Sequence, residues 1–402
     1  MQPIKITILG DYWDCQIYRG RLYLWDLDGD LMVYDWHEIV DSIIQDEKDF
    51  LATSCAFLKG NYLYGYHDIF EDKDFKNLLF QKFKRIEKLN WEINIEDISE
   101  FLIGEQESPF KDLPTDTEIS SNNLYAITDD GLWATTAHRR KSEKYPVSSR
   151  PLKLWDSKLL SLTANNYATI ALSGGDEGLF QYNKNRVDIF NQFEIQKKKE
   201  VEKEIVQVSD RHSLFNDWNN LSIYSSSDIA GSFLSLFEWK KSQDDVYHRK
   251  FSESISEDRI FEGMNLNGSL SWGAGDKIYK AINGGIVVTR FNNNAKSYNK
   301  DEEYFSEPEL IKLDELNGDV IQAKVCFYGT IIECENSLTI VQSNGKIFKI
   351  NEPVTRWRIY PRSINYENHL HVILDDRLEI YSFNHDYFVN QSEKIIGVMY
   401  KK

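Results

Sequence analysis

One short pattern recurs along this chain: an alternating apolar strand, a turn rich in Asp, Asn or Gly, and a second alternating strand. In the first copy, Arg21–Tyr34, the residues Asp28 and Gly29 favour the positive-φ turn of a tight hairpin. Three further clear copies follow at 123–133, 337–350 and 369–381. A single hairpin cannot bury its apolar face, so the pattern predicts a fold in which many hairpins stack against one another.

Weaker copies of the hairpin fill the intervals between the clear ones. They begin near Leu63, Ala168, Leu221 and Ile278. The six intervals that separate Leu22 from Leu338 average about 53 residues, close to the roughly 40–50 residues plus loops of a four-stranded propeller blade. The 22 Tyr, 22 Phe and 10 Trp also favour strands. This spacing indicates an all-β repeat fold with loops of variable length.

Two dipeptides support the same interpretation. Trp25-Asp26 and Trp155-Asp156 are similar to the dipeptide that ends a WD-repeat blade. With the hairpin spacing, they make the chain resemble β-propeller repeat proteins in general, over nearly its whole length. The resemblance implies one all-β domain over 1–402, a single β-propeller of about seven or eight four-stranded blades. Two smaller β domains are the alternative.

A ring of blades must close, and it must accommodate segments that lack the hairpin pattern. Ile4–Leu9 and 394–400 both alternate, and pairing of N- and C-terminal strands within one blade would remove the open edge. Three insertions are expected, near 37–50, 92–118 and 138–153. The first has apolar residues at helical spacing, whereas the second is acidic and contains prolines, which predicts an exposed loop. Residues 75–89 fit either an amphipathic helix or a long strand.

The composition narrows the class of protein. Asp and Glu outnumber Lys and Arg by 64 to 47, and the net charge of −17 repels nucleic-acid phosphates and anionic lipid. No stretch approaches the roughly 18 apolar residues of a membrane-spanning helix, and the N-terminus lacks the pattern of a signal peptide. Four cysteines without a CxxC pair indicate reduced thiols. We therefore expect a cytoplasmic protein.

Motifs that would indicate catalysis or a cofactor are weak. Residues 26–30 carry three Asp spaced like calcium ligands, but His37 stands where an EF-hand needs Glu, and a hairpin turn explains them better. His369 and His371 share one face of a strand, and a zinc site would need a third ligand. The sequence has neither a P-loop nor a nucleophile-elbow serine. We expect no enzyme activity, no metal and no cofactor.

The sharpest charge anomaly is the basic loop, residues 138–153, which holds six Lys or Arg against Glu143 alone. Pro146 and Pro151 favour an exposed loop there. We expect this loop to dock an acidic partner protein, with contact to nucleic-acid phosphates as the second choice. The candidate partner-binding residues are Arg139, Arg140, Lys141, Lys144, Arg150 and Lys153.

Together, these features favour a non-catalytic intracellular interaction or regulatory protein whose rigid body holds a partner protein. A subunit of a multicomponent signalling or defence assembly fits this description. Two alternatives stay open: a hydrolase-type propeller enzyme with a channel-sited active site, and a nucleic-acid-contacting accessory protein that uses the basic loop. A channel enzyme predicts convergent carboxylates or histidines with perturbed pKa values near the axis.

Overall fold

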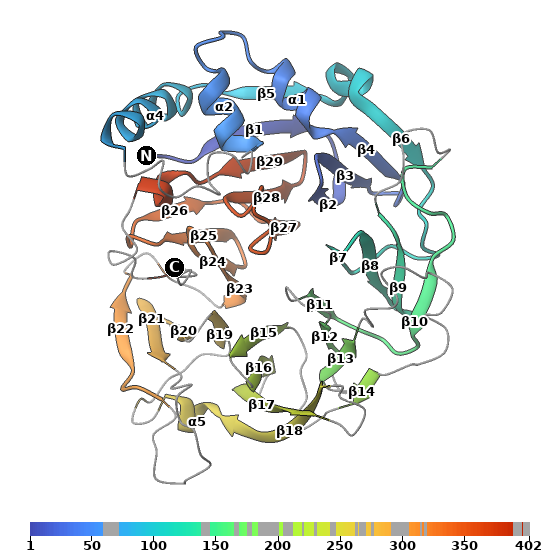
Figure 1. Cartoon of the computed structure of the whole chain (residues 1–402), viewed down its shortest axis with the longest axis vertical. Coiled ribbons are helices and arrows are strands. Elements are labelled where there is room, and N and C mark those ends of the chain that lie inside the picture. Colours follow the sequence, from blue (N-terminus) through green and yellow to red (C-terminus); the bar gives the residue numbers. More distant parts are fainter. Residues whose placement is uncertain are drawn as a thin grey trace.

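A computed structural model describes most of the chain, and all structural statements concern that part. The described residues are 1–58, 72–137, 145–164, 169–174, 179–183, 201–203, 212–218, 221–228, 231–241, 247–261, 264, 271–274, 277–290, 305–313, 316, 320–388 and 396. Within them the strands form seven sheets, which follow one another around a central axis (Figure 1). The prediction of a mostly β fold built from four-stranded antiparallel sheets is confirmed.

Six of the sheets have four strands each, and in each of them the chain runs from the innermost strand towards the rim (Figure 1). The first three sheets consist of β2 (Tyr12–Tyr18), β3 (Arg21–Asp26), β4 (Leu31–Asp35) and β6 (Leu102–Gln106); β7 (Asp116–Ser120), β8 (Asn123–Thr128), β9 (Gly131–Thr136) and β10 (Leu152–Trp155); and β11 (Ser161–Ala164), β12 (Thr169–Ser173), β13 (Leu179–Asn183) and β14 (Val201–Lys203). The next three consist of β15 (His212–Trp218), β16 (Leu221–Asp228), β17 (Gly231–Lys241) and β18 (Tyr247–Ser256); β19 (Ser271–Ala274), β20 (Lys277–Ile282), β21 (Gly285–Arg290) and β22 (Glu309–Lys312); and β23 (Val320–Cys326), β24 (Gly329–Cys334), β25 (Ser337–Gln342) and β26 (Ile347–Ile350).

The seventh sheet joins the beginning of the chain to its end. Its strands, from the axis outward, are β27 (Arg356–Ile359), β28 (His369–Leu374), β29 (Arg377–Ser382), β1 (Ile4–Leu9) and β5 (Trp91–Asn94). β1 pairs antiparallel with β29, with Ile4 opposite Ser382, and parallel with β5 on its other side. The candidate terminal strand 394–400 lies outside the described residues, apart from Ile396.

The hairpin copies found in the sequence, each marked by one residue here called its anchor, coincide with the sheets. Six of them lie in six different sheets, in the order Leu22, Leu124, Leu221, Ile278, Leu338 and Leu370. The anchors Leu63 and Ala168 lie outside the described residues. Gly29 has a φ of 90° in the turn between β3 and β4, as the first hairpin predicts.

A helical insertion separates β4 from β6 and lies at the outer rim (Figure 1). Its elements are α1 (Trp36–Ser42), α2 (Phe50–Phe57), α4 (Lys73–Ile86), β5 and the 3-10 helix η2 (Ile95–Phe101). The Asp35 carboxylate caps α1 by accepting the N–H of His37, and Asp72 caps α4 in the same way. The helical interpretation of 75–89 is the one the structure adopts.

Two of the expected insertions have different boundaries in the structure. The segment expected near 37–50 is only the start of the helical insertion, which continues to Phe101. The acidic stretch 92–118 is not an exposed loop, because it contains most of β5, η2, β6 and the start of β7. Most of its charges are exposed, apart from Asp116 and Glu118 on β7, while Ile93 and the preceding Trp91 pack into the core. Two further short helices are α5 (Glu257–Ile260) and η5 (His385–Phe388).

Apolar clusters between neighbouring sheets hold the ring together. The core that surrounds β1 combines strands of the first and seventh sheets with α1, α2 and α4, and Trp36 and Phe57 pack edge-to-face within it. The innermost strands also contact one another: β2 contacts β7 and β27, β7 contacts β11, β11 contacts β15, β15 contacts β19, and β19 contacts β23. This close approach places the side chains of several sheets together near the axis.

Candidate functional site

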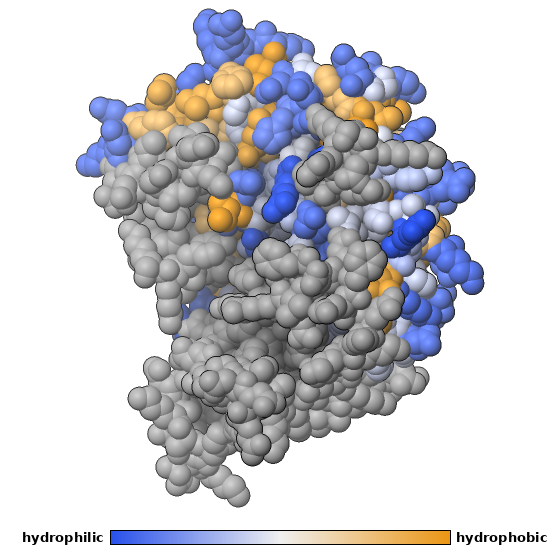
Figure 2. Space-filling view, turned by 45° about the vertical axis from the view of Figure 1, so that its right-hand side comes forward, coloured by the Kyte–Doolittle hydropathy of each residue, from blue (hydrophilic) through white to orange (hydrophobic). Residues whose placement is uncertain are grey.

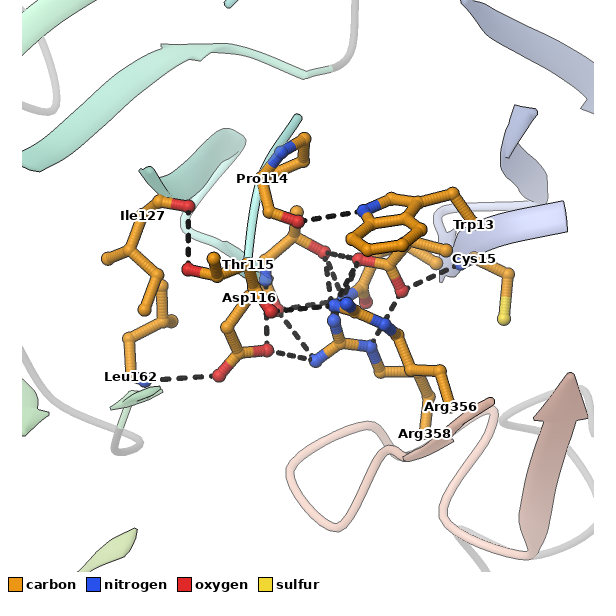
Figure 3. Close-up of polar contacts among 12 residues, drawn as sticks. Trp13, Cys15, Pro114, Thr115, Asp116, Ile127, Leu162, Arg356 and Arg358 are labelled. Atoms are coloured by element: carbon orange, nitrogen blue, oxygen red, sulfur yellow. Dashed lines mark hydrogen bonds and ion pairs between the residues drawn. The ribbon is translucent and has the colours of Figure 1, made fainter. Parts of the chain in front are cut away.

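Charged side chains meet near the axis on three of the innermost strands. Asp14 lies on β2, Asp116 on β7 and Arg358 on β27. Figure 3 shows Asp116 facing the guanidinium of Arg358, which also binds Asp14. We call Arg358 and the residues that it binds, Asp14, Asp116 and Thr117, the axial ion network. Asp14 is completely buried, and only 8% of Arg358 is exposed. Burial of this kind is tolerated only when the charges are paired.

Asp14 and Arg358 form a two-pronged ion pair. Arg358 Nε donates to Asp14 Oδ1 at 2.9 Å, and Arg358 Nη2 donates to Oδ2 at 2.7 Å. The Thr117 hydroxyl donates to the same Oδ2 at 2.7 Å, and the Cys15 N–H donates to Oδ1 at 2.8 Å. Such bidentate, charge-assisted bonds fix the relative position of both strands. Strands β2 and β27, which are far apart in sequence, are thereby linked.

Asp116 extends the network to two more sheets. Its Oδ1 accepts Arg358 Nη1 at 2.5 Å, and its Oδ2 accepts the N–H of Leu162 on β11 at 3.1 Å. Burial alone would raise the pKa of Asp116, but the attraction of Arg358 outweighs it and holds the pKa below its usual value. Arg362, just after β27, forms a further ion pair with Glu118 on β7. Four sheets are therefore tied together by ionised groups.

Two cations of this region lie over tryptophan rings. The Arg356 guanidinium is 5.1 Å from the Trp13 ring centroid and donates to the Thr115 carbonyl at 2.9 Å. Lys324 Nζ, on β23, is 5.5 Å from the Trp357 ring centroid. Desolvation lowers the pKa of Lys324. Both contacts are typical cation–π geometries.

Among the described residues, Glu333 on β24 is the one carboxylate whose pKa is clearly shifted upward. Burial raises its pKa, and Trp357 Nε1 donates to its Oε2 at 2.6 Å. It faces Gln322 across the β23–β24 pair, and the nearest cation that affects it is Lys324. A carboxyl group with a raised pKa beside an amine with a lowered pKa is found at reactive sites and also in structural ion networks.

The two predicted histidines are buried together on β28. Their ring centroids are 5.7 Å apart, and His371 Nδ1 lies 3.2 Å from the Tyr360 hydroxyl and 3.7 Å from Cys15 Sγ. Burial, reinforced by His369, lowers the pKa of His371 well below its usual value, so this ring is neutral. Among the described residues, no three His, Cys, Asp or Glu side chains lie close enough together to hold a metal ion.

The basic loop is only partly described. Arg139, Arg140, Lys141 and Lys144 lie outside the described residues, so the structure does not place them. Arg150 is exposed. In contrast, Lys153 Nζ binds Asp130 at 2.8 Å and Asp156 at 2.5 Å. Of the six predicted residues, the structure therefore describes only Arg150 and Lys153, and it shows Lys153 engaged by acids of this chain.

The weaker motifs also have explanations in the fold. The Asp26 carboxylate accepts the N–H groups of Asp28 at 3.0 Å and Asp30 at 2.9 Å, so it stabilises the hairpin turn. The four cysteines are all buried thiols. In the β23–β24 pair, Cys326 lies opposite Gly329 and Cys334 lies opposite Val320. Among the described residues, no helix is long and apolar enough to cross a membrane.

The axial ion network could not be found from the sequence by motif. The available signal is the presence of charged residues within short apolar strands: Asp14 on β2, Asp116 and Glu118 on β7, and Arg356 and Arg358 on β27. Alternation places each pair on one face of its strand, which suggests a common environment. The partners are separated by more than 100 residues in the chain, so one sequence does not reveal which acid meets which arginine.

Comparison with known proteins reveals similarities of fold alone. No family model matches the chain, and no curated protein matches it. Among solved structures, it is similar to BBS1N in a complex with ARL6DN, at 8% identity over 94% of each chain with a TM-score of 0.48. It is also similar to the Cps50 (Swd1) β-propeller domain of Myceliophteria thermophila, at 8% identity over 95% of this chain and 100% of that one, with a TM-score of 0.45. The computationally designed Ika8 protein matches at 7% identity over 93% and 96%, with a TM-score of 0.42. The seven sheets around a central axis agree with the resemblance to β-propeller proteins drawn from the hairpin repeat.

Proposed function

We propose that the chain is a protein-binding β-propeller, a single domain over 1–402 in which each of the seven sheets is one blade. In this proposal it acts without catalysis, as an interaction or regulatory subunit of a multicomponent signalling or defence assembly. The observation that carries the proposal is the axial ion network. Asp14, Asp116 and Glu118 are each bound by arginine, so the carboxylates nearest the axis serve to join sheets.

The rim offers what a binding protein needs. Apolar side chains gather at the end of the molecule where Figure 1 places the helical insertion, as the space-filling view shows (Figure 2). Phe50, Leu78 and Leu89 are 54%, 52% and 41% exposed there. Exposed apolar groups on an element outside the repeat are typical of interaction surfaces. A rigid ring that presents such an element is suited to hold a partner.

A second contact in the proposal is the basic loop, which would meet an acidic surface of the partner. Arg139, Arg140, Lys141 and Lys144 supply the positive charge, while Arg150 is exposed beside them in sequence. The net charge of −17 disfavours a nucleic acid as the partner. We therefore prefer an acidic protein whose negative charge is concentrated opposite this loop. The four buried thiols agree with the proposed cytoplasmic location, where thiols stay reduced.

The proposal is tested by affinity purification of a tagged chain from its native cells, with identification of protein and nucleic acid that co-elute. We expect a stoichiometric protein partner that is lost when Arg139, Arg140, Lys141 and Lys144 are all changed to Glu. A matched control changes four lysines elsewhere to Glu: Lys73, Lys111, Lys158 and Lys312. If the first variant retains every interaction, the basic loop is not a docking site.

The same purification separates the alternatives. A purified chain that turns over substrate, with activity lost in Glu333→Gln, would contradict the non-catalytic proposal in favour of a channel enzyme. Co-elution of nucleic acid that is released by moderate salt would favour the accessory-protein alternative, since phosphate contacts weaken steeply with ionic strength.

A further inference from the structure

The outermost strand of the seventh sheet has one unpaired edge within the described residues. β5 pairs with β1 in parallel, with Ile6 opposite Trp91 and Leu9 opposite Asn94, and it is the last strand in the order of that sheet. Figure 1 shows it at the rim, beyond β1. No other described strand pairs with it. Its outward N–H and C=O groups can therefore accept an extended peptide as an additional strand.

A groove of about 240 Å³ opens beside the first residue of this strand. Its walls combine the apolar side chains of the helical insertion with charged ones. The lining includes Ile43, Leu89, Trp91, Asp46, Asp49 and Arg85. The volume is smaller than the roughly 300–1,000 Å³ of sites for small-molecule ligands, and it suits one or two side chains of a peptide.

The charges of the groove are unbalanced towards the negative. Arg85 is shared by two acids, since its Nη2 lies 2.7 Å from Asp46 Oδ2 and its Nε lies 2.8 Å from Asp49 Oδ1. Glu92 is exposed on β5 itself. The N–H of Lys48 and the Arg85 side chain lower the pKa of Asp46, which keeps it ionised. Two carboxylates against one guanidinium line the groove and give it an affinity for positive charge.

From this juxtaposition we propose that β5 and the adjoining groove bind an extended, positively charged peptide segment of a partner protein. The peptide adds to the free edge of β5 by main-chain hydrogen bonds. One of its apolar side chains enters the groove between Leu89 and Trp91, and a Lys or Arg faces Asp46. This inference rests on the proposed protein-binding function and names the chemistry of one contact.

The probe for this site is a phage-displayed library of random peptides, selected on the immobilised full chain. We expect enrichment of peptides that carry a Lys or Arg near an aliphatic or aromatic residue. A synthetic version of the enriched peptide should bind Asp46→Lys at least about tenfold more weakly, a change of about 1.4 kcal/mol in binding free energy. Glu100→Lys is the matched control, because Glu100 is exposed on the same insertion but does not line the groove. Absence of enrichment, or equal loss in both variants, would overturn the proposal.

Hydrogen–deuterium exchange distinguishes strand addition from simple side-chain docking. Saturating the full chain with the enriched peptide should slow exchange of the outward amides within 91–94, because they become hydrogen-bonded. Unchanged exchange in this segment would overturn the proposal even if the peptide binds. Self-association of the wild-type chain that is abolished by Asp46→Lys would also overturn it, since the occupant would then be a second copy.

The failure of this inference can be told apart from failure of the proposed function. If a partner captured from native cells is retained by Asp46→Lys, and no peptide is enriched, the edge of β5 is not a docking site but the protein-binding function stands. If no partner is captured by any version while Asp46-dependent peptide binding is found, the edge proposal stands and the wider function does not. Loss of the partner in Asp46→Lys but not in Glu100→Lys, with peptide enrichment, supports both.

Discussion

Removing the guanidinium of Arg358 should be among the most destabilising single changes in this protein. Arg358→Met keeps much of the aliphatic volume but deprives Asp14 of two hydrogen bonds and Asp116 of one. Asp14 would keep the Cys15 N–H and the Thr117 hydroxyl, with Arg356 Nη1 at 3.4 Å as its remaining cation. Removal of one partner from a buried ion pair costs about 3–5 kcal/mol, and we expect a loss in that range.

The measurement is urea unfolding followed by tryptophan fluorescence and by far-ultraviolet circular dichroism. Arg362→Met is the matched control, because the Arg362–Glu118 pair is roughly one-quarter exposed and its loss should cost about 1 kcal/mol or less. A double variant, Arg358→Met with Asp14→Leu, leaves no unpaired charge at Asp14. It should therefore be less destabilised than the sum of its two single variants.

The result that refutes this reasoning is equally definite. If Arg358→Met and Arg362→Met lower the free energy of unfolding equally, burial does not control the strength of the axial ion network. If the double variant equals the sum of the single variants, Asp14 and Arg358 are not energetically coupled. Either outcome would contradict the structural role that we propose for the carboxylates near the axis.

Three further predictions follow from the buried groups. His371 is neutral in the folded chain and protonates in the unfolded one, so stability should fall as the pH drops from about 7 to 5, and His371→Phe should reduce that slope in denaturation at each pH. Hydrogen bonds from Lys5, Arg377 and Tyr381 lower the pKa of Glu379, although burial raises it. Glu379→Gln should therefore lower the free energy of unfolding by about 1–3 kcal/mol at neutral pH. Denaturation at lower pH should show a smaller difference from wild type. The thiols should resist a thiol reagent until the chain unfolds, because burial raises the pKa of Cys55 to about 12 and that of Cys15 as well; rapid labelling of the native protein would contradict this.

Local signals in the sequence predicted the sheets well. The turn at Gly29 and the alternation of the flanking strands both depend on residues a few positions apart, and the structure forms β3 and β4 there. The apolar spacing after this hairpin predicted α1 for the same reason. Such patterns require no knowledge of distant partners.

Features that depend on distant contacts were predicted less well. The acidic stretch 92–118 has the composition of a loop, but β5 within it is stabilised by pairing with β1, about 85 residues earlier in the chain. The axial ion network likewise depends on pairs such as Asp14 with Arg358. Composition indicates which residues are charged, whereas only the fold determines which charges are buried together.

The position of β5 has a consequence for how the chain is made. Both β1 and β5 belong to the first hundred residues, yet the strand that covers the inner edge of β1 is β29, near the other end. On a ribosome, which emits the N-terminus first, β1 must wait for almost the whole chain before Ile4 can meet Ser382. β5, which is synthesised early, pairs with the other edge of β1, and the helices of the insertion pack against the same core. These contacts cover part of β1 during synthesis. A nascent chain stopped before β29 would expose that inner edge, and it would become a substrate for chaperones or for aggregation.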